Sequence, residues 1–198
     1  SILAASIVAL TKTNLKARLA YSTVSQLGYI VMGAALASPL AASGAALHIA
    51  THAAGKITLF FCAGAIYVAH HLSDIKDMDG LGRRMPITYG AFALAALSII
   101  GVPPLGGAWS KFMLMAGAMD GLHLWVLVVL ILSSLLNLVY LGDVVVRGFF
   151  APAKAGSVAA SGDYSEAPWA CLVPICVTTG LCLMLFFSVD FFLLEFRG

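Results

Sequence analysis

The stretch LHIATHAAGKITLFFCAGAIYV, residues 47–68, decides how the chain folds. A helix that crosses a lipid bilayer needs about 20 mostly apolar residues, and this stretch is long and apolar enough to be one. His48, His52 and Lys56 occur in it at intervals of four, which places their side chains on one face of a helix. Because a lysine at the centre of a bilayer costs about 2.5–3.5 kcal/mol on insertion scales, we expect Lys56 to have a function.

Two interpretations of Lys56 are open at this point. In the structural one, the long side chain reaches the membrane interface or donates to carbonyls at a helix end, which is difficult from the middle of a span. In the functional one, burial disfavours the ammonium form, so that the amine gains and loses a proton, as an arginine could not. His52 and His48 would then relay protons to it, since histidine titrates near neutral pH, or each would be a packing histidine.

The composition indicates a membrane protein. Of the 198 residues, 61% are hydrophobic and 10% are charged, whereas soluble domains carry about 25% charged residues. The sequence therefore predicts a multi-pass protein of the cell (inner) membrane, surrounded by the lipid bilayer. Its net charge of +2, with the basic residues in short loops, argues against a nucleic-acid partner. The sequence contains no nucleotide, haem, metal or CxxC motif, so we expect no cofactor and no metal site.

Apolar runs on either side of this stretch predict an all-α transmembrane bundle of about six spans. We expect spans or parts of spans at 1–10, 19–37, 87–102, 124–146 and 169–189, with links at 38–46 and 151–168 and an interfacial tail at 190–198. The link 151–168 is rich in Ala, Gly, Ser and Pro, which predicts a flexible loop. Eight Lys and Arg residues fall in the loops 12–18, 76–84 and 147–154, and the positive-inside rule would place these loops in the cytoplasm.

A second lysine follows a predicted break in a helix. The sequence PPLGG at 103–107 ends one apolar run, because proline removes a backbone donor and glycine loosens the chain. The next run, 108–119, is short and carries Lys111, a pattern typical of discontinuous transporter helices. Lys111 would face a polar cavity or, alternatively, the interface. No carboxylate stands at mid-span beside either lysine, and Asp143 is expected to pair with Arg147, four residues further on.

Other polar residues lie within the predicted spans. Ser25 and Gln26 in the run 19–37 and Tyr140 in the run 124–146 are the candidates to support the titratable groups. Such side chains also hold neighbouring helices together in lipid, so a packing role and a role in a wet path are both open.

Four blocks of sequence resemble, in this order, the antiporter-like membrane subunits. This family includes membrane subunits of proton-pumping NADH:quinone oxidoreductase, related hydrogenase subunits and the Mrp-type cation/proton antiporters. The blocks are LKARLAYSTVSQLGYI (15–30), HIATHAAGKITLFF (48–61), DGLGRRMP (79–86) and GVPPLGGAWSKF (101–112). The run 56–68 is most similar to the D-type subunit of the Mrp antiporter.

The resemblance implies a role for each matching residue. Lys56 matches the central lysine of the family's second half-channel, and His52 and His48 match the histidines one and two turns before it. Lys111 matches the lysine of the broken helix that leads to the opposite aqueous side. Family members contain two inverted half-channels, so residues 1–198 are expected to form a single transmembrane domain that corresponds to the second half, without the glutamate and lysine of the first. Gly55 departs from the family, in which a bulky residue is common at this position.

We therefore expect the chain to translocate protons, with Na⁺ as a candidate second ion, as a subunit of a multisubunit cation/proton antiporter with other membrane subunits as partners. One alternative is a proton-pumping membrane subunit of an NADH:quinone oxidoreductase-type or hydrogenase complex. Another alternative is a structural membrane subunit that transports no ion. Whether the chain belongs to an enzyme stays open, since the redox chemistry of such a complex takes place in other subunits.

Overall fold

The computed structural model describes residues 1–153, 158–160 and 164–189, and within these ranges the secondary structure is helical. The long helices begin and end close to the boundaries of the apolar runs. They are α1 (Ile2–Thr11), α2 (Leu15–Ala35), α3 (Pro39–His70), α4 (Pro86–Ile100), α5 (Gly107–Asp120), α6 (Leu124–Phe150) and α7 (Trp169–Phe187). Three short 3-10 helices, η1 (Ile75–Asp77), η2 (Leu81–Arg83) and η3 (Val158–Ala160), lie in the connections. The predicted tail at 190–198 lies outside the described residues.

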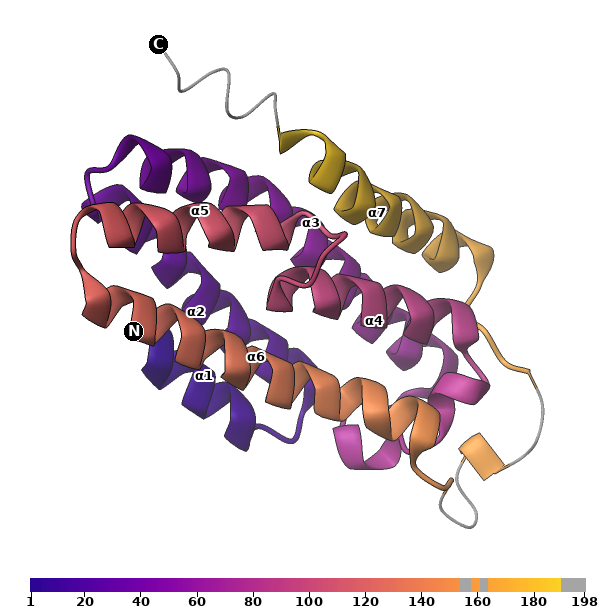
Figure 1. Cartoon of the computed structure of the whole chain (residues 1–198). Coiled ribbons are helices and arrows are strands. Elements are labelled where there is room, and N and C mark those ends of the chain that lie inside the picture. The colour runs from indigo at the N-terminus through magenta and orange to yellow at the C-terminus, as the bar shows by residue number, and fades with distance from the viewer. Residues whose placement is uncertain (154–157, 161–163, 190–198) are drawn as a thin grey trace.

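The helix that contains the stretch 47–68 is the centre of the bundle. At 32 residues, α3 runs the length of the molecule and packs against α2, α4, α5 and α7 (Figure 1). On the other side of the bundle, α6 packs against α1, α4 and α5. The polar face of α3 is therefore surrounded by other helices rather than by lipid.

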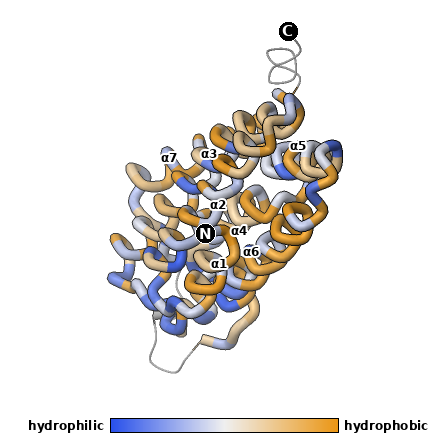
Figure 2. Tube along the Cα trace, turned by 90° about the vertical axis from the view of Figure 1, so that its left-hand side faces the viewer, coloured by the Kyte–Doolittle hydropathy of each residue, from blue (hydrophilic) through white to orange (hydrophobic). Residues whose placement is uncertain are grey.

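The surface of the bundle is suited to a bilayer. Among the described residues, α3, α6 and α7 are each long and apolar enough to cross a membrane. Large apolar side chains such as Val31, Trp125 and Met184 are mostly exposed, as expected for residues that face lipid. Figure 2 shows hydrophobic residues along most of each helix and hydrophilic residues gathered mainly at one end. The chain is a multi-pass membrane protein with an all-α fold.

Two short helices, α4 and α5, form one interrupted crossing beside α3. The end of α4 lies at the middle of α3, where Ile99 packs against Gly55. The start of α5 lies one turn further along, where Gly106 faces Thr51, and its last turn reaches Ala41 near the beginning of α3. The predicted break at 103–107 is confirmed. With α4 and α5 counted as one crossing, the described part of the chain has five crossings and the ten-residue helix α1, which agrees with about six predicted spans of which the first is partial.

Two predicted boundaries are wrong. The link predicted at 38–46 is helical, and α3 already begins at Pro39, a residue that favours the first helical turn. Small side chains in this part let α3 approach α5 closely, since a Cβ at Gly44 would lie 2.9 Å from the backbone nitrogen of Leu114. Likewise α2 begins at Leu15, so that Lys16 and Arg18 are helical. Its start is fixed by the Asn14 side chain, which accepts a hydrogen bond from the backbone of Ala17 at 3.1 Å.

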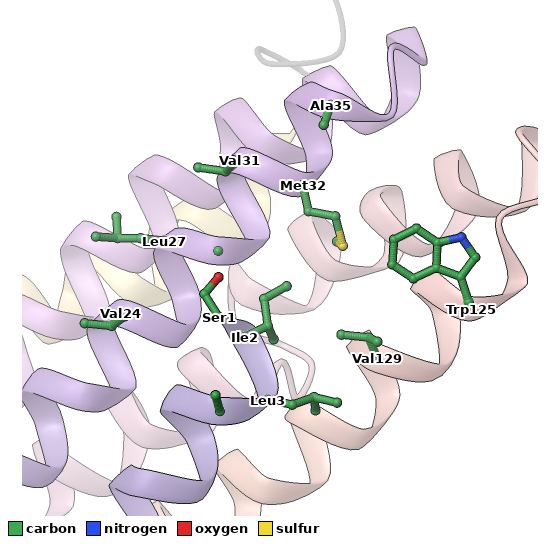
Figure 3. Close-up of a pocket in the computed structure, with 12 residues that line it drawn as sticks. Ser1, Ile2, Leu3, Val24, Leu27, Val31, Met32, Ala35, Trp125 and Val129 are labelled. Carbon is green, nitrogen blue, oxygen red and sulfur yellow. The ribbon is translucent and has the colours of Figure 1, made fainter.

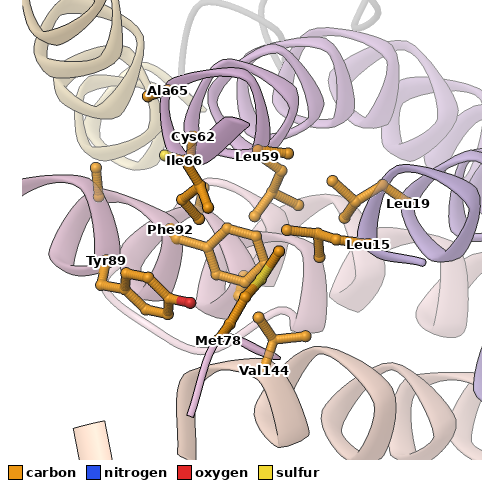
Figure 4. Packing of buried hydrophobic residues seen from close by; sticks show 14 of the residues in the cluster. Leu15, Leu19, Leu59, Cys62, Ala65, Ile66, Met78, Tyr89, Phe92 and Val144 are labelled. Atoms are coloured by element: carbon orange, nitrogen blue, oxygen red, sulfur yellow. The ribbon is translucent and has the colours of Figure 1, made fainter. Parts of the chain in front are cut away.

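The three basic loops lie together at one end of the bundle, which confirms that they share one side. The backbone of Leu15 donates to the carbonyl of Ser73, and that of Gly80 donates to the carbonyl of Arg147. Beneath these loops is an apolar core to which α2, α3, α4, α6 and the loop 71–85 all contribute (Figure 4). We refer to this end as the basic end; Lys154, also expected there, lies outside the described residues.

A chain of ion pairs ties the basic end together. Arg18 on α2 lies 2.8 Å from Asp143 on α6, and Arg147 lies 3.0 Å from both Asp143 and Asp79. The pairing of Asp143 with Arg147 was predicted from their spacing. The partners Arg18 and Asp79 were not predicted, because the contacts bring together segments that are distant in sequence.

The described end of the predicted flexible link is anchored rather than free. The Glu166 carboxylate accepts hydrogen bonds from the backbone of Ile87 at 2.6 Å and from the hydroxyl of Thr88 at 2.7 Å. A carboxylate at this place satisfies free N–H groups at the start of α4 and interacts favourably with the helix dipole. Residues 154–157 and 161–163 of the link lie outside the described part of the chain.

Candidate functional site

The polar face of α3 lies inside the bundle. His48, His52 and Lys56 are 2%, 8% and 5% exposed, so all three titratable side chains are withdrawn from the surface. Lys56 is withdrawn from water, which argues against the interpretation in which its amine reaches the membrane interface. The bundle thus encloses a column of basic groups, one helical turn apart.

Lys56 is held by α2. Its ammonium nitrogen lies 2.6 Å from the hydroxyl oxygen of Ser22 and 3.3 Å from the carbonyl oxygen of Leu19, and it donates to both. Asp79 and Asp143 pair with Arg18 and Arg147 and not with Lys56. A buried cation with neutral acceptors alone is costly, which favours a lysine that changes its protonation state.

The hydrogen bonding continues from Ser22 into α6. The hydroxyl of Tyr140 lies 2.8 Å from the Ser22 oxygen and also forms a hydrogen bond with the Oδ1 atom of Asn137. Ser22, Tyr140 and Asn137 are fully buried. The structure thus brings Tyr140, one of the candidate supporting residues, into contact with Ser22, the hydroxyl that faces Lys56.

His48 connects α3 to α2 and to α5. Its Nδ1 lies 2.9 Å from the hydroxyl of Ser110, and its Nε2 lies 3.1 Å from the Oε1 atom of Gln26. The ring also stacks on Tyr29, with 5.4 Å between centroids, and on His52, with 6.1 Å between centroids. Gln26 is thus part of the site. His48 also contacts Ser110, which directly precedes the second lysine, Lys111, in the sequence.

Lys111 lies at the break between α4 and α5. Its ammonium nitrogen donates to the carbonyl of Ile100 and to the hydroxyl of Ser134, both at 3.0 Å, and lies 5.1 Å from the centre of the Tyr29 ring. The side chain is 4% exposed. A groove of about 260 Å³ on the outer side of the bundle, between α4, α5 and α6, includes Lys111 and Ser134 in its lining. Lys111 is therefore as buried as Lys56, but it lies beside a groove.

Together these contacts form an interrupted polar column from Lys56 to Lys111. It passes from Lys56 to His52 and His48 along α3, and from His48 to Ser110, the residue before Lys111. His52 Nε2, Gln26 Nε2 and Asn137 Nδ2 are buried in this region without a hydrogen-bond partner among the described residues. Buried polar atoms normally have partners, so groups of this kind mark places that water or a transported ion would satisfy.

Ser25 is not part of this column. Its hydroxyl lies 2.8 Å from that of Ser6 and 3.3 Å from that of Ser133, in a cluster that joins α1, α2 and α6. This arrangement fits the packing role that was left open for it.

Five contributors to the column and its hydrogen bonds were not singled out as site residues from the sequence: Ser22, Tyr29, Ser110, Ser134 and Asn137. Ser22 and Tyr29 could have been found from the sequence, because residues 22 and 29 are spaced to lie on the same face of a helix as the candidate Gln26. Ser110 and Ser134 carry no comparable signal, since their partners come from other helices.

A second groove, of about 580 Å³, lies between α1, α2 and α6 and does not reach the lysines (Figure 3). Apart from Ser1 its lining is apolar, with Leu27, Val31, Met32 and Trp125 facing it. Such a surface suits hydrocarbon and offers no groups that would conduct ions. In the described part of the chain, no group of His, Cys, Asp and Glu side chains is arranged to hold a metal ion.

Both the sequence and the fold of this chain are similar to those of known proteins. Residues 1–137 match the family described as NADH:quinone oxidoreductase/Mrp antiporter, transmembrane. Among curated proteins, the chain is 44% identical over 149 residues to NADH-quinone oxidoreductase subunit N of Desulforudis audaxviator, a match that covers 75% of this chain and 30% of that protein.

The same fold occurs in solved membrane complexes. A chain of the Mrp complex from Dietzia sp. DQ12-45-1b superimposes with a TM-score of 0.87 at 21% identity, covering 98% of this chain and 43% of that one. A chain of respiratory complex I from Thermus thermophilus superimposes with a TM-score of 0.82 at 21% identity, covering 99% and 40%. At these identities the superpositions show the fold alone. The chain spans less than half the length of each of the three proteins.

Proposed function

The chain belongs to the NADH:quinone oxidoreductase/Mrp antiporter transmembrane family, and on that basis we propose that it translocates protons as a membrane subunit of a multisubunit complex. The observation that carries this proposal is the buried column of titratable side chains from Lys56 through His52 and His48 to Lys111. Ionisable residues within a membrane are costly and typically mark ion or proton pathways.

In this proposal Lys56 is the central proton site. Its enclosed amine takes up and releases a proton, and the two histidines exchange protons between it and the second lysine. Water molecules at the unpaired nitrogen atoms of His52 and Gln26 would complete the path where side chains do not touch. Gln26 orients His48, and Tyr140 orients Ser22, the hydroxyl that faces Lys56.

Lys111 is proposed as the group that exchanges protons with the outside of the bundle. The groove beside it opens between α4, α5 and α6, and its other lining residues include Ile131, Leu135 and Leu138. These apolar residues face the membrane, so a neighbouring membrane subunit, rather than bulk water alone, is expected to cover the opening. Residues 1–198 would then form one half-channel of a larger assembly, and the basic end would face the cytoplasm.

Two kinds of complex remain candidates. A cation/proton antiporter, with Na⁺ as the coupled ion, is favoured by the resemblance of the run 56–68 to D-type antiporter subunits. An oxidoreductase-type proton pump is favoured by the 44% identity to a subunit N, across 75% of this chain. In neither case would this chain carry the redox chemistry, since a buried column of amines and imidazoles transfers protons and not electrons.

The test is proton transport in sealed vesicles that contain the purified complex, with a pH-sensitive dye inside. Lys56→Ala should abolish proton-coupled transport while the complex still assembles. Undiminished transport by this variant would contradict the proposal, and an intact wild-type complex without any ion flux would favour a structural subunit. The co-purified partners separate the two candidates, because an oxidoreductase brings flavin and iron–sulfur absorbance and an antiporter responds to added Na⁺.

A further inference from the structure

A hydrogen-bonded string links Lys56 to an asparagine that it does not touch. The string runs from the Lys56 ammonium to Ser22, from Ser22 to the Tyr140 hydroxyl, and from Tyr140 to the Oδ1 atom of Asn137. It crosses from α3 through α2 to α6, and all four side chains are 5% exposed or less. The other end of the asparagine amide, Nδ2, is buried without a hydrogen-bond partner among the described residues.

The number of hydrogens restricts how this string is arranged. An ammonium group donates only, an amide oxygen accepts only, and the tyrosine hydroxyl has a single hydrogen. With Oδ1 of Asn137 next to Tyr140, that hydrogen is used for the amide oxygen. The hydroxyl of Ser22 then donates to the tyrosine oxygen, and the lone pairs of Ser22 face Lys56. In this arrangement the string presents an acceptor to Lys56 and favours the charged ammonium.

Rotation of the amide would reverse the string. If Nδ2 of Asn137 faced Tyr140, the amide would donate to the tyrosine oxygen, and the tyrosine hydrogen would go to Ser22. The hydroxyl hydrogen of Ser22 would then be free to point at Lys56, where a neutral amine can accept it. Both arrangements keep every contact along the string, and in the observed orientation Nδ2 of Asn137 has no hydrogen bond to the described residues that the rotation would break.

We propose that Asn137 is a positioning residue for proton exchange: through Tyr140 and Ser22, the orientation of its amide sets whether Lys56 faces an acceptor or a donor. The inference rests on the proposed function, because it concerns the proton affinity of the same lysine. With Oδ1 of Asn137 facing Tyr140, the amide favours the protonated form of Lys56. With Nδ2 facing Tyr140, it favours the neutral form and so the release of the proton.

Other titratable groups and acceptors lie around Lys56 and the string. They are the Leu19 carbonyl and Tyr29 on α2, His52 on α3, Lys111 on α5, Cys182 on α7 near Ala54, and the Arg18–Asp143 pair, in which Arg18 also donates to the Tyr140 carbonyl. On α4, the residue that packs beside Lys56, at Gly55, is the apolar Ile99. None of these groups is a member of the string. The effect of the string on Lys56 can therefore be separated from theirs by removing the Tyr140 hydroxyl.

The test is the pH dependence of proton transport in vesicles for four forms of the complex: wild type, Asn137→Leu, Tyr140→Phe and the double variant. Asn137→Leu removes the terminal acceptor, so the pH of half-maximal transport should fall by about one unit, a tenfold change in proton affinity. In the Tyr140→Phe background, the same substitution should shift this pH by less than a third as much, because the string is already broken.

Two further variants keep the test decisive. Asn137→Asp is close in shape and presents acceptors only, so it should raise the pH of half-maximal transport, and it replaces Asn137→Leu if the latter fails to assemble. Thr58→Val is the matched control, since the hydroxyl of the buried Thr58 donates to the Ala54 carbonyl of its own helix and is not part of the string, and its pH profile should equal the wild type.

Two outcomes would overturn the inference. The first is an unchanged pH profile for Asn137→Leu or, failing its assembly, for Asn137→Asp. The second is an equal shift with and without the Tyr140 hydroxyl, which would show that Asn137 acts by another route. Either result, together with loss of transport in Lys56→Ala, would leave the proposed function standing. Full transport in Lys56→Ala would instead remove the proposed function itself.

Discussion

The amine of Lys56 on α3 lies 2.6 Å from the hydroxyl of Ser22 on α2, so the central buried cation is held by a neutral acceptor of a neighbouring helix. This contact makes the site sensitive to its surroundings. A carboxylate partner would hold the proton on the lysine, whereas a hydroxyl both accepts and donates. The pair therefore suits a group that changes its protonation state.

Removal of the Ser22 hydroxyl should slow proton transport without loss of assembly. Ser22→Ala takes away one hydrogen bond to a charged group, and we expect a decrease of about tenfold in the transport rate. Ser43→Ala is the control, since the hydroxyl of the buried Ser43 bonds to the Pro39 carbonyl of its own helix. Equal rates for the two variants in vesicles would show that Ser22 has no special role.

Loss of the Lys111 amine should block exchange with the outside of the bundle. Lys111→Met keeps the length of the side chain and removes the charge, so we expect proton transport to fall by at least about a hundredfold, as when a positioned proton donor is removed. Lys16→Met removes an exposed lysine at the basic end and should transport normally. If both variants retain wild-type rates, the proton leaves the column at another residue.

The chain of ion pairs at the basic end should matter for stability more than for transport. Arg18 is 8% exposed and donates to the Lys12 and Tyr140 carbonyls and to Asp143. Arg18→Ala should therefore destabilise the complex by about 2–3 kcal/mol, measured as a lower midpoint of thermal unfolding in detergent. Lys12→Ala, at a less buried position in the same segment, is the comparison and should lower the midpoint much less.

The break in the α4–α5 crossing should not tolerate a side chain at its second glycine. A Cβ at Gly107 would overlap the carbonyl oxygen of Ser98, so the backbone would have to move. Gly107→Ala should abolish assembly, as seen by loss of the complex on size-exclusion chromatography. Gly90→Ala, on α4 with open space around the new methyl group, should assemble normally and gain helix propensity of up to about 1 kcal/mol. Normal assembly of both variants would mean that the break is easily rearranged.

The sequence was sufficient to predict the column on α3 and the break before Lys111. The spacing of His48, His52 and Lys56 by four fixes their common face on any α-helix, and the PPLGG sequence cannot continue one. These predictions depend on local geometry alone, which is why the structure agrees with them.

Features that depend on tertiary packing could not be predicted in the same way. The start of α3 was placed too late because Ala, Gly and Ser at 41–46 look like a link, whereas in the fold they allow contact with α5. Ser22 meets Tyr140 across more than a hundred residues of sequence, and no local pattern specifies that pair. The same holds for Arg18 and Asp143, which were each predicted to lie at the basic end but not to meet.

The most direct test of the account is proton transport by Lys56→Arg in the intact complex. Arginine keeps the positive charge and can still donate to Ser22, but it does not release its proton in proteins. We predict that this variant assembles and transports no protons above background in sealed vesicles. Transport at the wild-type rate would contradict the claim that a proton is taken up and released at Lys56.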